Sequence, residues 1–115
     1  MKSKEYMSIL KMIDYIDKAF KYTENVSLDD FIGNDEKIDA TVFSISQIGE
    51  LVKNITVETM RKYPNIEWIV IKNLRNKIVH DYEGINLNLI WDILKNDLSD
   101  LRKNLENIIN KNKID

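Results

Sequence analysis

Residues Leu87–Asn110 read LNLIWDILKNDLSDLRKNLENIIN, with apolar side chains recurring at steps of three and four residues. This spacing places the apolar side chains on one side of a helix and the charged ones on the other. The apolar positions are Leu87, Ile90, Trp91, Leu94, Leu98, Leu101, Leu105 and Ile108. We therefore predict a long amphipathic helix, of the kind that packs in a helical bundle.

Three earlier segments show the same pattern. Residues 5–24 carry one apolar stripe, and residues 35–59 carry a wider apolar face. Residues 66–80 form a third predicted helix, which follows the only proline in the chain. No useful length of alternating apolar and polar residues predicts a strand. The expected fold is all-α, an antiparallel four-helix-type bundle with one extra short helical turn.

Two local features refine this prediction. Ser27 is the expected N-cap of the extra turn, which spans residues 28–32. Gly49 lies inside the predicted helix 35–59, where glycine costs about 1 kcal/mol relative to alanine. We expect another backbone to approach closely there, although a merely tolerated glycine fits the sequence equally well.

Length and composition narrow the class of protein. With 115 residues we expect a single domain over residues 1–115. No cysteine and one histidine cannot supply the common zinc ligand sets, so we expect no metal and no cofactor. Apolar runs are too short to span a bilayer, and the N-terminus lacks a signal-peptide core, so we expect no membrane association and a cytoplasmic location.

The net charge of −2 bears on nucleic-acid binding. Proteins that hold nucleic acid by bulk electrostatics are usually basic, because phosphate neutralisation supplies much of their affinity. If the protein acts on nucleic acid, we therefore expect the contact to be local and transient. The candidate cations all lie in the middle of the chain: Lys53, Arg61, Lys62, Lys72, Arg75 and Lys77.

The segment Leu74–Tyr82, LRNKIVHDY, is the candidate for chemistry. It places Arg75 five residues before His80, the only histidine, and Tyr82 two residues after it. Projected as one helix at about 100° per residue, Arg75 and His80 lie about 140° apart. The same projection puts His80 opposite the core stripe, on a face shared with Ile69, Asn73 and Asn76.

A symmetric dimer would supply two histidines and two arginines to one site. Metal-free RNA cleavage needs such a set, with one imidazole as base and another as acid. The arginines would stabilise the negative charge on phosphorus. Each of these residues also has a purely structural interpretation. A lone histidine near a helix end is often a cap or a surface group. Arg75 could pair with Asp81 or Glu50, and Tyr82 could contribute only to packing.

The segment Arg75–Tyr82 resembles the R-x4-H-x-Y motif of HEPN domains, specifically the HepT-like toxin subfamily. The resemblance extends to Ile48-Gly49-Glu50, to the Pro64–Trp68 entry into the motif helix and to Ile90–Ile93. It covers nearly the whole chain, in the expected order.

This resemblance implies an all-helical, HEPN-like homodimer that acts as a metal-independent ribonuclease toxin, encoded beside a minimal nucleotidyltransferase antitoxin. It implies that Arg75 and His80 form the catalytic pair, with Asn76 in support. Tyr82 would be the target for AMP addition by the antitoxin. Asp81 departs from the pattern, and its carboxylate would either orient the imidazole or form a local cap.

Two other functions compete with this one. The protein could be a non-catalytic helical dimer that binds a nucleotidyltransferase partner through Ile69, Asn73 and His80. It could also be a nucleotide-binding regulator in which Arg75 and Lys72 hold a phosphate.

Overall fold

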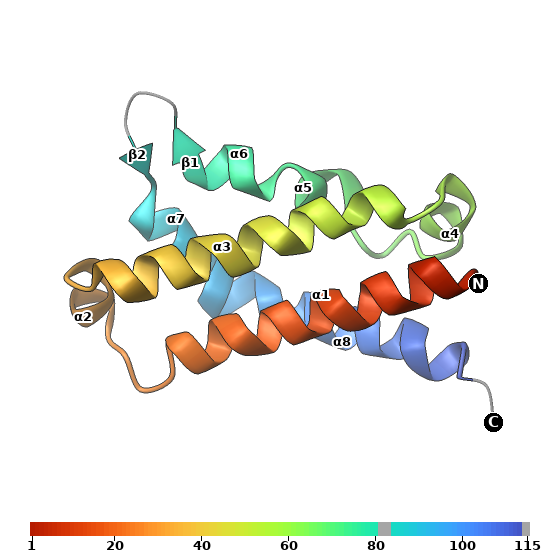
Figure 1. The fold of residues 1–115 in the computed structure, drawn as a ribbon, viewed down its shortest axis with the longest axis horizontal. Helices are drawn as coiled ribbons and strands as arrows, with labels where there is room; N and C mark the ends of the chain where they lie inside the picture. Colours follow the sequence, from red (N-terminus) through yellow and green to blue (C-terminus); the bar gives the residue numbers. More distant parts are fainter. Residues whose placement is uncertain (81–83, 114–115) are drawn as a thin grey trace.

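The computed structural model describes residues 1–80 and 84–113, apart from the side chain of His80. Its frame is a helical bundle (Figure 1). Helices α1 (Ser3–Tyr22) and α3 (Asp35–Leu51) run antiparallel side by side, joined through the short α2 (Leu28–Ile32). Helix α8 (Leu98–Lys111) packs against α1. The expected all-α bundle is confirmed.

The two short helices that precede His80, which we call the motif segment, lie along α3 on the side away from α1 (Figure 1). They are α5 (Trp68–Lys72) and α6 (Leu74–Ile78), and both contact α3. The remaining elements are a 3₁₀ turn (Val52–Asn54), α4 (Val57–Lys62), a two-residue ladder of β1 (Val79–His80) with β2 (Gly84–Ile85), α7 (Leu87–Asp92) and a π-helical segment (Ile93–Asp97).

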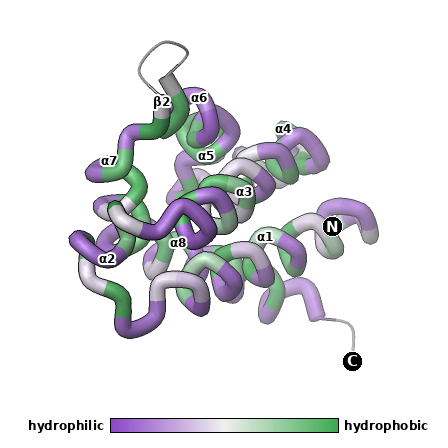
Figure 2. Tube along the Cα trace, turned by 60° about the vertical axis from the view of Figure 1, so that its left-hand side comes forward, coloured by the Kyte–Doolittle hydropathy of each residue, from purple (hydrophilic) through white to green (hydrophobic). Residues whose placement is uncertain are grey.

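The core lies between these helices, where each contributes its apolar stripe (Figure 2). Ile9, Met12 and Ile16 from α1 are fully buried, as are Ile45 and Ile48 from α3. The motif segment adds Ile71, Leu74 and Ile78, the stripe that the helical projection predicts. These anchors fix one side of α5 and α6 and leave the other side in solvent.

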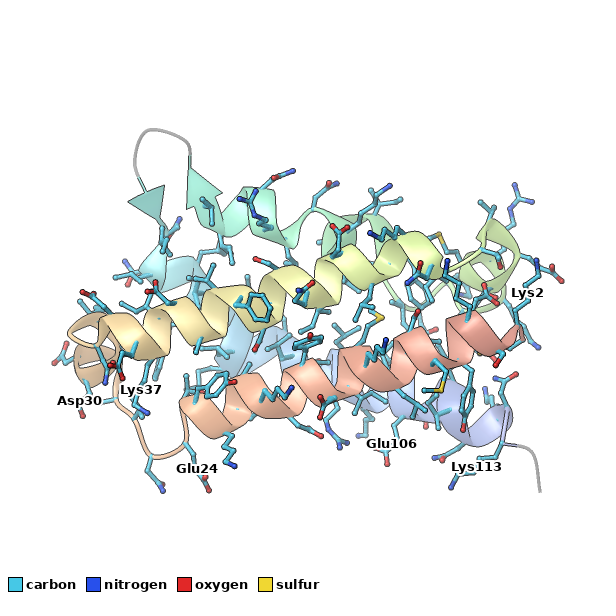
Figure 3. All side chains as sticks on the ribbon, in the orientation of Figure 1. Lys2, Glu24, Asp30, Lys37, Glu106 and Lys113 are labelled. Carbon is cyan, nitrogen blue, oxygen red and sulfur yellow. The ribbon has the colours of Figure 1, made fainter. Side chains whose placement is uncertain are left out.

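The extra turn at residues 28–32 is confirmed as α2. The Ser27 side chain accepts a hydrogen bond of 3.1 Å from the Asp30 backbone N–H, so Ser27 is the N-cap. This turn, which contains Asp30, lies at the same end of the bundle as Lys37, whereas Lys2 and Lys113 lie at the other end (Figure 3). The β1–β2 ladder is on the α2 side of the molecule (Figure 1).

The prediction of one helix over residues 35–59 is wrong at its C-terminal end. Helix α3 stops at Leu51, and Ile55 is extended with φ −93° and ψ 126°. Thr56 then caps α4, and its backbone N–H donates a 2.6 Å hydrogen bond to the buried carboxylate of Glu5 in α1. A contact 51 residues away in sequence thus helps to end one helix and begin the next.

The predicted helix over residues 87–110 is helical throughout, but it includes the π-helical segment Ile93–Asp97. Ile93, Leu94 and Leu98 remain buried across this segment. Among the described residues, no helix has the length and apolar content needed to cross a membrane.

Candidate active site

The motif segment is two short helices, not the single helix over residues 66–80 that the sequence predicts. Helix α5 ends at Lys72, and Asn73 has φ −97° and ψ 8°. The Asn73 backbone N–H donates to the carbonyls of Ile69 and Val70, at 3.3 and 3.2 Å. The β-branched run Ile69–Ile71 has low helix propensity, which makes a break here inexpensive.

The structure differs from the predicted helix a second time, at the end of α6. Helix α6 stops at Ile78, and Val79 is extended with φ −113° and ψ 114°. Val79 pairs with Ile85, and His80 pairs with Gly84, in an antiparallel ladder. The backbone N–H of Asn86 donates to the Ile78 carbonyl at 2.8 Å, so a residue after the hairpin satisfies the carbonyl that ends α6.

His80 therefore lies on extended backbone, and the projection that placed it about 140° from Arg75 on one straight helix does not apply. Gly84, which closes the hairpin, has φ +78°, a conformation that glycine adopts at little cost. Gly84 and the β-branched Val79 are the signals in the sequence for this ladder, but two paired residues in each strand are too few to give a periodic pattern.

Arg75 and Asn76 both lie on the exposed side of α6. The ion pairs formed by the described residues join Lys18 to Asp14, Lys53 to Glu50, and Arg102 to both Asp17 and Glu106. Arg75 takes part in none of them. The suggested pairing of Arg75 with Glu50 is wrong, since Glu50 Oε1 lies 2.6 Å from Lys53 Nζ.

Hydrogen bonding and charge from Lys53 lower the pKa of the exposed Glu50 carboxyl. This carboxylate is therefore paired with Lys53, and Arg75 is exposed on α6. Lys72 and Lys77 are exposed on the same pair of short helices, so this segment carries three solvent-facing cations within six residues. An anionic ligand would meet positive charge on this segment, although the net charge of the whole chain is −2.

The face predicted to lie beside His80 is apolar and open. Ile69 is 62% exposed and Val70 is 46% exposed. Asn73 and Asn76 are exposed as well. Ile69 and Val70 line a shallow depression of about 370 Å³, whose other walls are mainly apolar and include Met60 and Trp68. An apolar face of this kind next to polar motif residues is typical of a surface that meets another macromolecule.

Asp81 and Tyr82 lie outside the described residues, and so does the side chain of His80. The relative placement of Arg75, His80 and Tyr82 therefore stays a prediction. Within residues 1–80 and 84–113, no group of three or more His, Cys, Asp or Glu side chains is arranged to hold a metal ion.

Comparison with known proteins shows to which family the chain is related. The family described as ribonuclease HepT-like matches residues 12–108. A protein of Methanocaldococcus jannaschii named "Putative RNase" is 36% identical over 104 residues, covering 90% of this chain and 83% of its own length. A "Putative RNase" of Caldanaerobacter subterraneus is 32% identical, covering 78% and 80% of the two chains.

A "Probable ribonuclease HepT" of Thermococcus cleftensis is 27% identical over 106 residues, covering 91% of this chain and 94% of its own. No solved structure matches the protein. The matched range contains α3, the motif segment and most of α8, so it spans the bundle and the candidate site together. The chain belongs to the ribonuclease HepT-like family.

Proposed function

We propose that this protein is an endoribonuclease whose active site forms between two copies of the chain. Arg75 and His80 of both copies would surround one phosphodiester of the RNA. The observation that carries the proposal is the state of Arg75: in a HepT-like chain, it is exposed on α6 and joins no ion pair among the described residues. An exposed guanidinium of this kind can bind a phosphate group.

The chemistry follows from the residue types and needs no metal ion. One imidazole removes the proton from a ribose 2′-hydroxyl, and the 2′-oxygen then attacks the adjacent phosphorus. The bond from phosphorus to the 5′-oxygen breaks, and the imidazolium of the second copy donates a proton to that leaving oxygen. The products are a 2′,3′-cyclic phosphate and a 5′-hydroxyl. The Arg75 guanidinium stabilises the negative charge that develops on the phosphoryl oxygens.

Two further polar residues complete the proposed site. Asn76 is exposed beside Arg75 and would donate a hydrogen bond to the substrate or to His80. Asp81 would accept a hydrogen bond from the imidazole and favour its protonated form. The role of Asn76 comes from the family resemblance, whereas that of Asp81, which departs from the family pattern, comes from its place next to His80 in the sequence. Of the two residues, only Asn76 has a described position.

The homodimer is supported by the exposed apolar side chains next to the motif. Burying Ile69 and Val70 against a second chain would remove them from water and bring the two motif segments together. A two-fold axis here gives each active site the second histidine that a single chain lacks. Catalysis and dimerisation are thus expected to be lost together when this face is made polar.

We further propose a toxin role in the cytoplasm, with a minimal nucleotidyltransferase as the antitoxin. Transfer of AMP from ATP to the Tyr82 hydroxyl would release pyrophosphate and leave a phosphodiester two residues from His80. The bulky anionic adduct would block the site and repel the phosphates of RNA. The Tyr82 assignment rests on the family resemblance to the R-x4-H-x-Y motif.

Cleavage of a short RNA by the purified dimer tests the proposed activity. We expect products with 2′,3′-cyclic phosphate ends in the presence of EDTA, and we expect His80→Ala to be inactive while remaining dimeric. Loss of cleavage on adding the chelator would contradict the mechanism. An intact mass spectrum after co-expression with the neighbouring nucleotidyltransferase should show a gain of one or more AMP units, absent in Tyr82→Phe.

In a second function, the exposed Ile69 and Val70 would contact a nucleotidyltransferase instead of a second copy of the chain, and the protein would be a non-catalytic helical dimer that binds this partner. That function predicts binding of the partner but no cleavage of any RNA in a broad panel. Cleavage that depends on His80 would exclude it.

A further inference from the structure

Gly49 of α3 is buried where α3 meets the motif segment. A Cβ atom at this position would lie 2.7 Å from the carbonyl oxygen of Ile71 and 3.2 Å from that of Lys72. Both oxygens belong to backbone, which cannot turn aside as a flexible side chain does. The close backbone approach expected from the sequence is confirmed, and its partner is the last turn of α5.

This contact lies immediately before the break at Asn73. Helix α6 begins one residue later and contains only five residues, too few to be stable without neighbours. Leu74 and Ile78 anchor its buried side. Those two anchors set how deeply α6 sits, but the position from which α6 starts depends on where α5 ends.

We infer that Gly49 is a positioning residue for Arg75. Because Gly49 has no side chain, the carbonyl groups of Ile71 and Lys72 can pack directly against α3, a contact we call the Gly49 seat. This contact fixes the end of α5 and therefore the position from which α6 presents the Arg75 guanidinium. Arg75 is only three residues beyond Lys72, so a displacement of the α5 end is carried directly to it. The inference rests on the proposed function, in which Arg75 contacts the scissile phosphate.

Helix propensity alone predicts the opposite effect for an alanine at this position. Replacing glycine by alanine inside a helix normally favours the helix. Here the added methyl group would force the α5 end away from α3, because a 2.7 Å approach between Cβ and a carbonyl oxygen is not tolerated. A displacement of about 1 Å at a catalytic group can lower the rate about 100-fold.

Gly33 provides a matched control. It follows α2, has an ordinary φ of −85°, and a Cβ there would lie 3.7 Å from the nearest atom, the Asp29 carbonyl oxygen. Gly33→Ala should therefore leave RNA cleavage unchanged. Gly49→Ala should lower kcat by about 10- to 100-fold with KM changed less than about threefold, and the protein should remain dimeric.

The decisive measurement is a cycle with Arg75→Lys, which keeps the charge but loses the two-pronged geometry of the guanidinium. If Gly49 acts through Arg75, the loss in kcat caused by Gly49→Ala should shrink to less than about threefold when Arg75→Lys is already present. The ¹⁵N resonance of the Arg75 side-chain Nε–H should also shift in Gly49→Ala and stay unchanged in Gly33→Ala.

The outcomes separate the two proposals. Wild-type protein without nuclease activity, or Arg75→Ala as active as wild type, overturns the proposed function and with it the role of Gly49. If Gly49→Ala is fully active while Arg75→Ala is inactive, the Gly49 inference alone is overturned. The same holds if Gly49→Ala lowers kcat as much in the Arg75→Lys protein as it does in the wild type.

If Gly49→Ala fails to fold, the same measurements can be made in a stabilised background. Thr41→Val serves this purpose, because the Thr41 hydroxyl is buried in α3 with no hydrogen-bond partner in the described part of the protein. A Gly49→Ala, Thr41→Val protein that still does not fold would show that Gly49 is needed for the bundle as a whole, and would overturn its specific role at Arg75.

Discussion

The long helices of the frame and the motif segment are built in different ways. Helices α1, α3 and α8 have 20, 17 and 14 residues, and each buries a periodic apolar stripe over several turns. Helices α5 and α6 have five residues each and depend on particular contacts: the Gly49 seat, the Asn73 hydrogen bonds and the bond from Asn86 to Ile78. The candidate chemistry thus lies on the part with the least local stability of its own.

A cavity in the frame should have the largest effect on stability. Ile16 is fully buried in α1, so Ile16→Ala should lower the free energy of unfolding by about 2–5 kcal/mol. Leu10, on the same helix, is 36% exposed, and Leu10→Ala should cost less than about 1 kcal/mol. Chemical denaturation measures both, and equal losses would mean that α1 does not carry the core.

The motif should show the reverse behaviour. Arg75→Ala should lower RNA cleavage by about 100- to 1000-fold, because under the proposed function the Arg75 guanidinium stabilises the transition state. The free energy of unfolding should change by less than about 0.5 kcal/mol, since Arg75 is exposed. Lys103→Ala, which removes an exposed cation of α8 that is not among the candidate RNA contacts, is the control and should retain activity. A large stability loss in Arg75→Ala would remove the distinction between frame and motif.

The buried Glu5 connects the frame to α4, and it should make stability depend on pH. Burial tends to raise the pKa of this carboxyl, but hydrogen bonds from Thr56, Thr59 and the Lys2 backbone outweigh it and lower the pKa below its ordinary value. The stabilisation from this group is therefore present above about pH 4.3, the unfolded pKa, and is lost as pH falls through the lower native pKa.

Glu5→Gln should accordingly lower the free energy of unfolding near neutral pH by about 1.5–3 kcal/mol. The difference from wild type should narrow as the pH falls below about 4.3. Denaturation curves at several pH values measure this, with Glu24→Gln, at an exposed carboxylate, as the control. A difference that stayed constant down to low pH would mean that the charge of Glu5 is not what holds α4.

The smallest effect is expected at Thr41, whose side chain is fully buried without a partner among the described residues. Thr41→Val should raise the free energy of unfolding by about 1 kcal/mol, because an unsatisfied hydroxyl is removed. Thr59→Val should do the opposite, since the Thr59 hydroxyl donates to Glu5 at 3.1 Å. Thermal unfolding compares the two, and destabilisation by Thr41→Val would point to a bonding partner for this hydroxyl.

Much of the frame could be predicted from the sequence. The stripes in residues 5–24 and 87–110, the Ser27 cap and the close approach at Gly49 all appear in the structure. The stripes and the cap were predictable because each depends on residues within one helix, where spacing and residue type suffice. At Gly49 the sequence indicated a close approach, and the structure identified its partner as the end of α5. The same local reading identified Arg75 and Asn76, and both prove to be exposed.

The errors share a different cause. The predicted helices over residues 35–59 and 66–80 both continue past their real ends, at Leu51 and Ile78. In each case a residue far along the chain or across a hairpin supplies the hydrogen bond that favours the break: Glu5 for Thr56, and Asn86 for Ile78. Apolar spacing carries no information about such partners.

The sequence by itself determined that the protein is a helical bundle and which short motif carries its candidate chemistry, because periodicity and residue type act over a few residues. Only the tertiary structure decided that this part of the chain is two short helices followed by a short ladder, with the end of α5 packed against Gly49. The reason is physical: helices of five residues cannot hold their own direction, so contacts from α3 and from Asn86 set it for them.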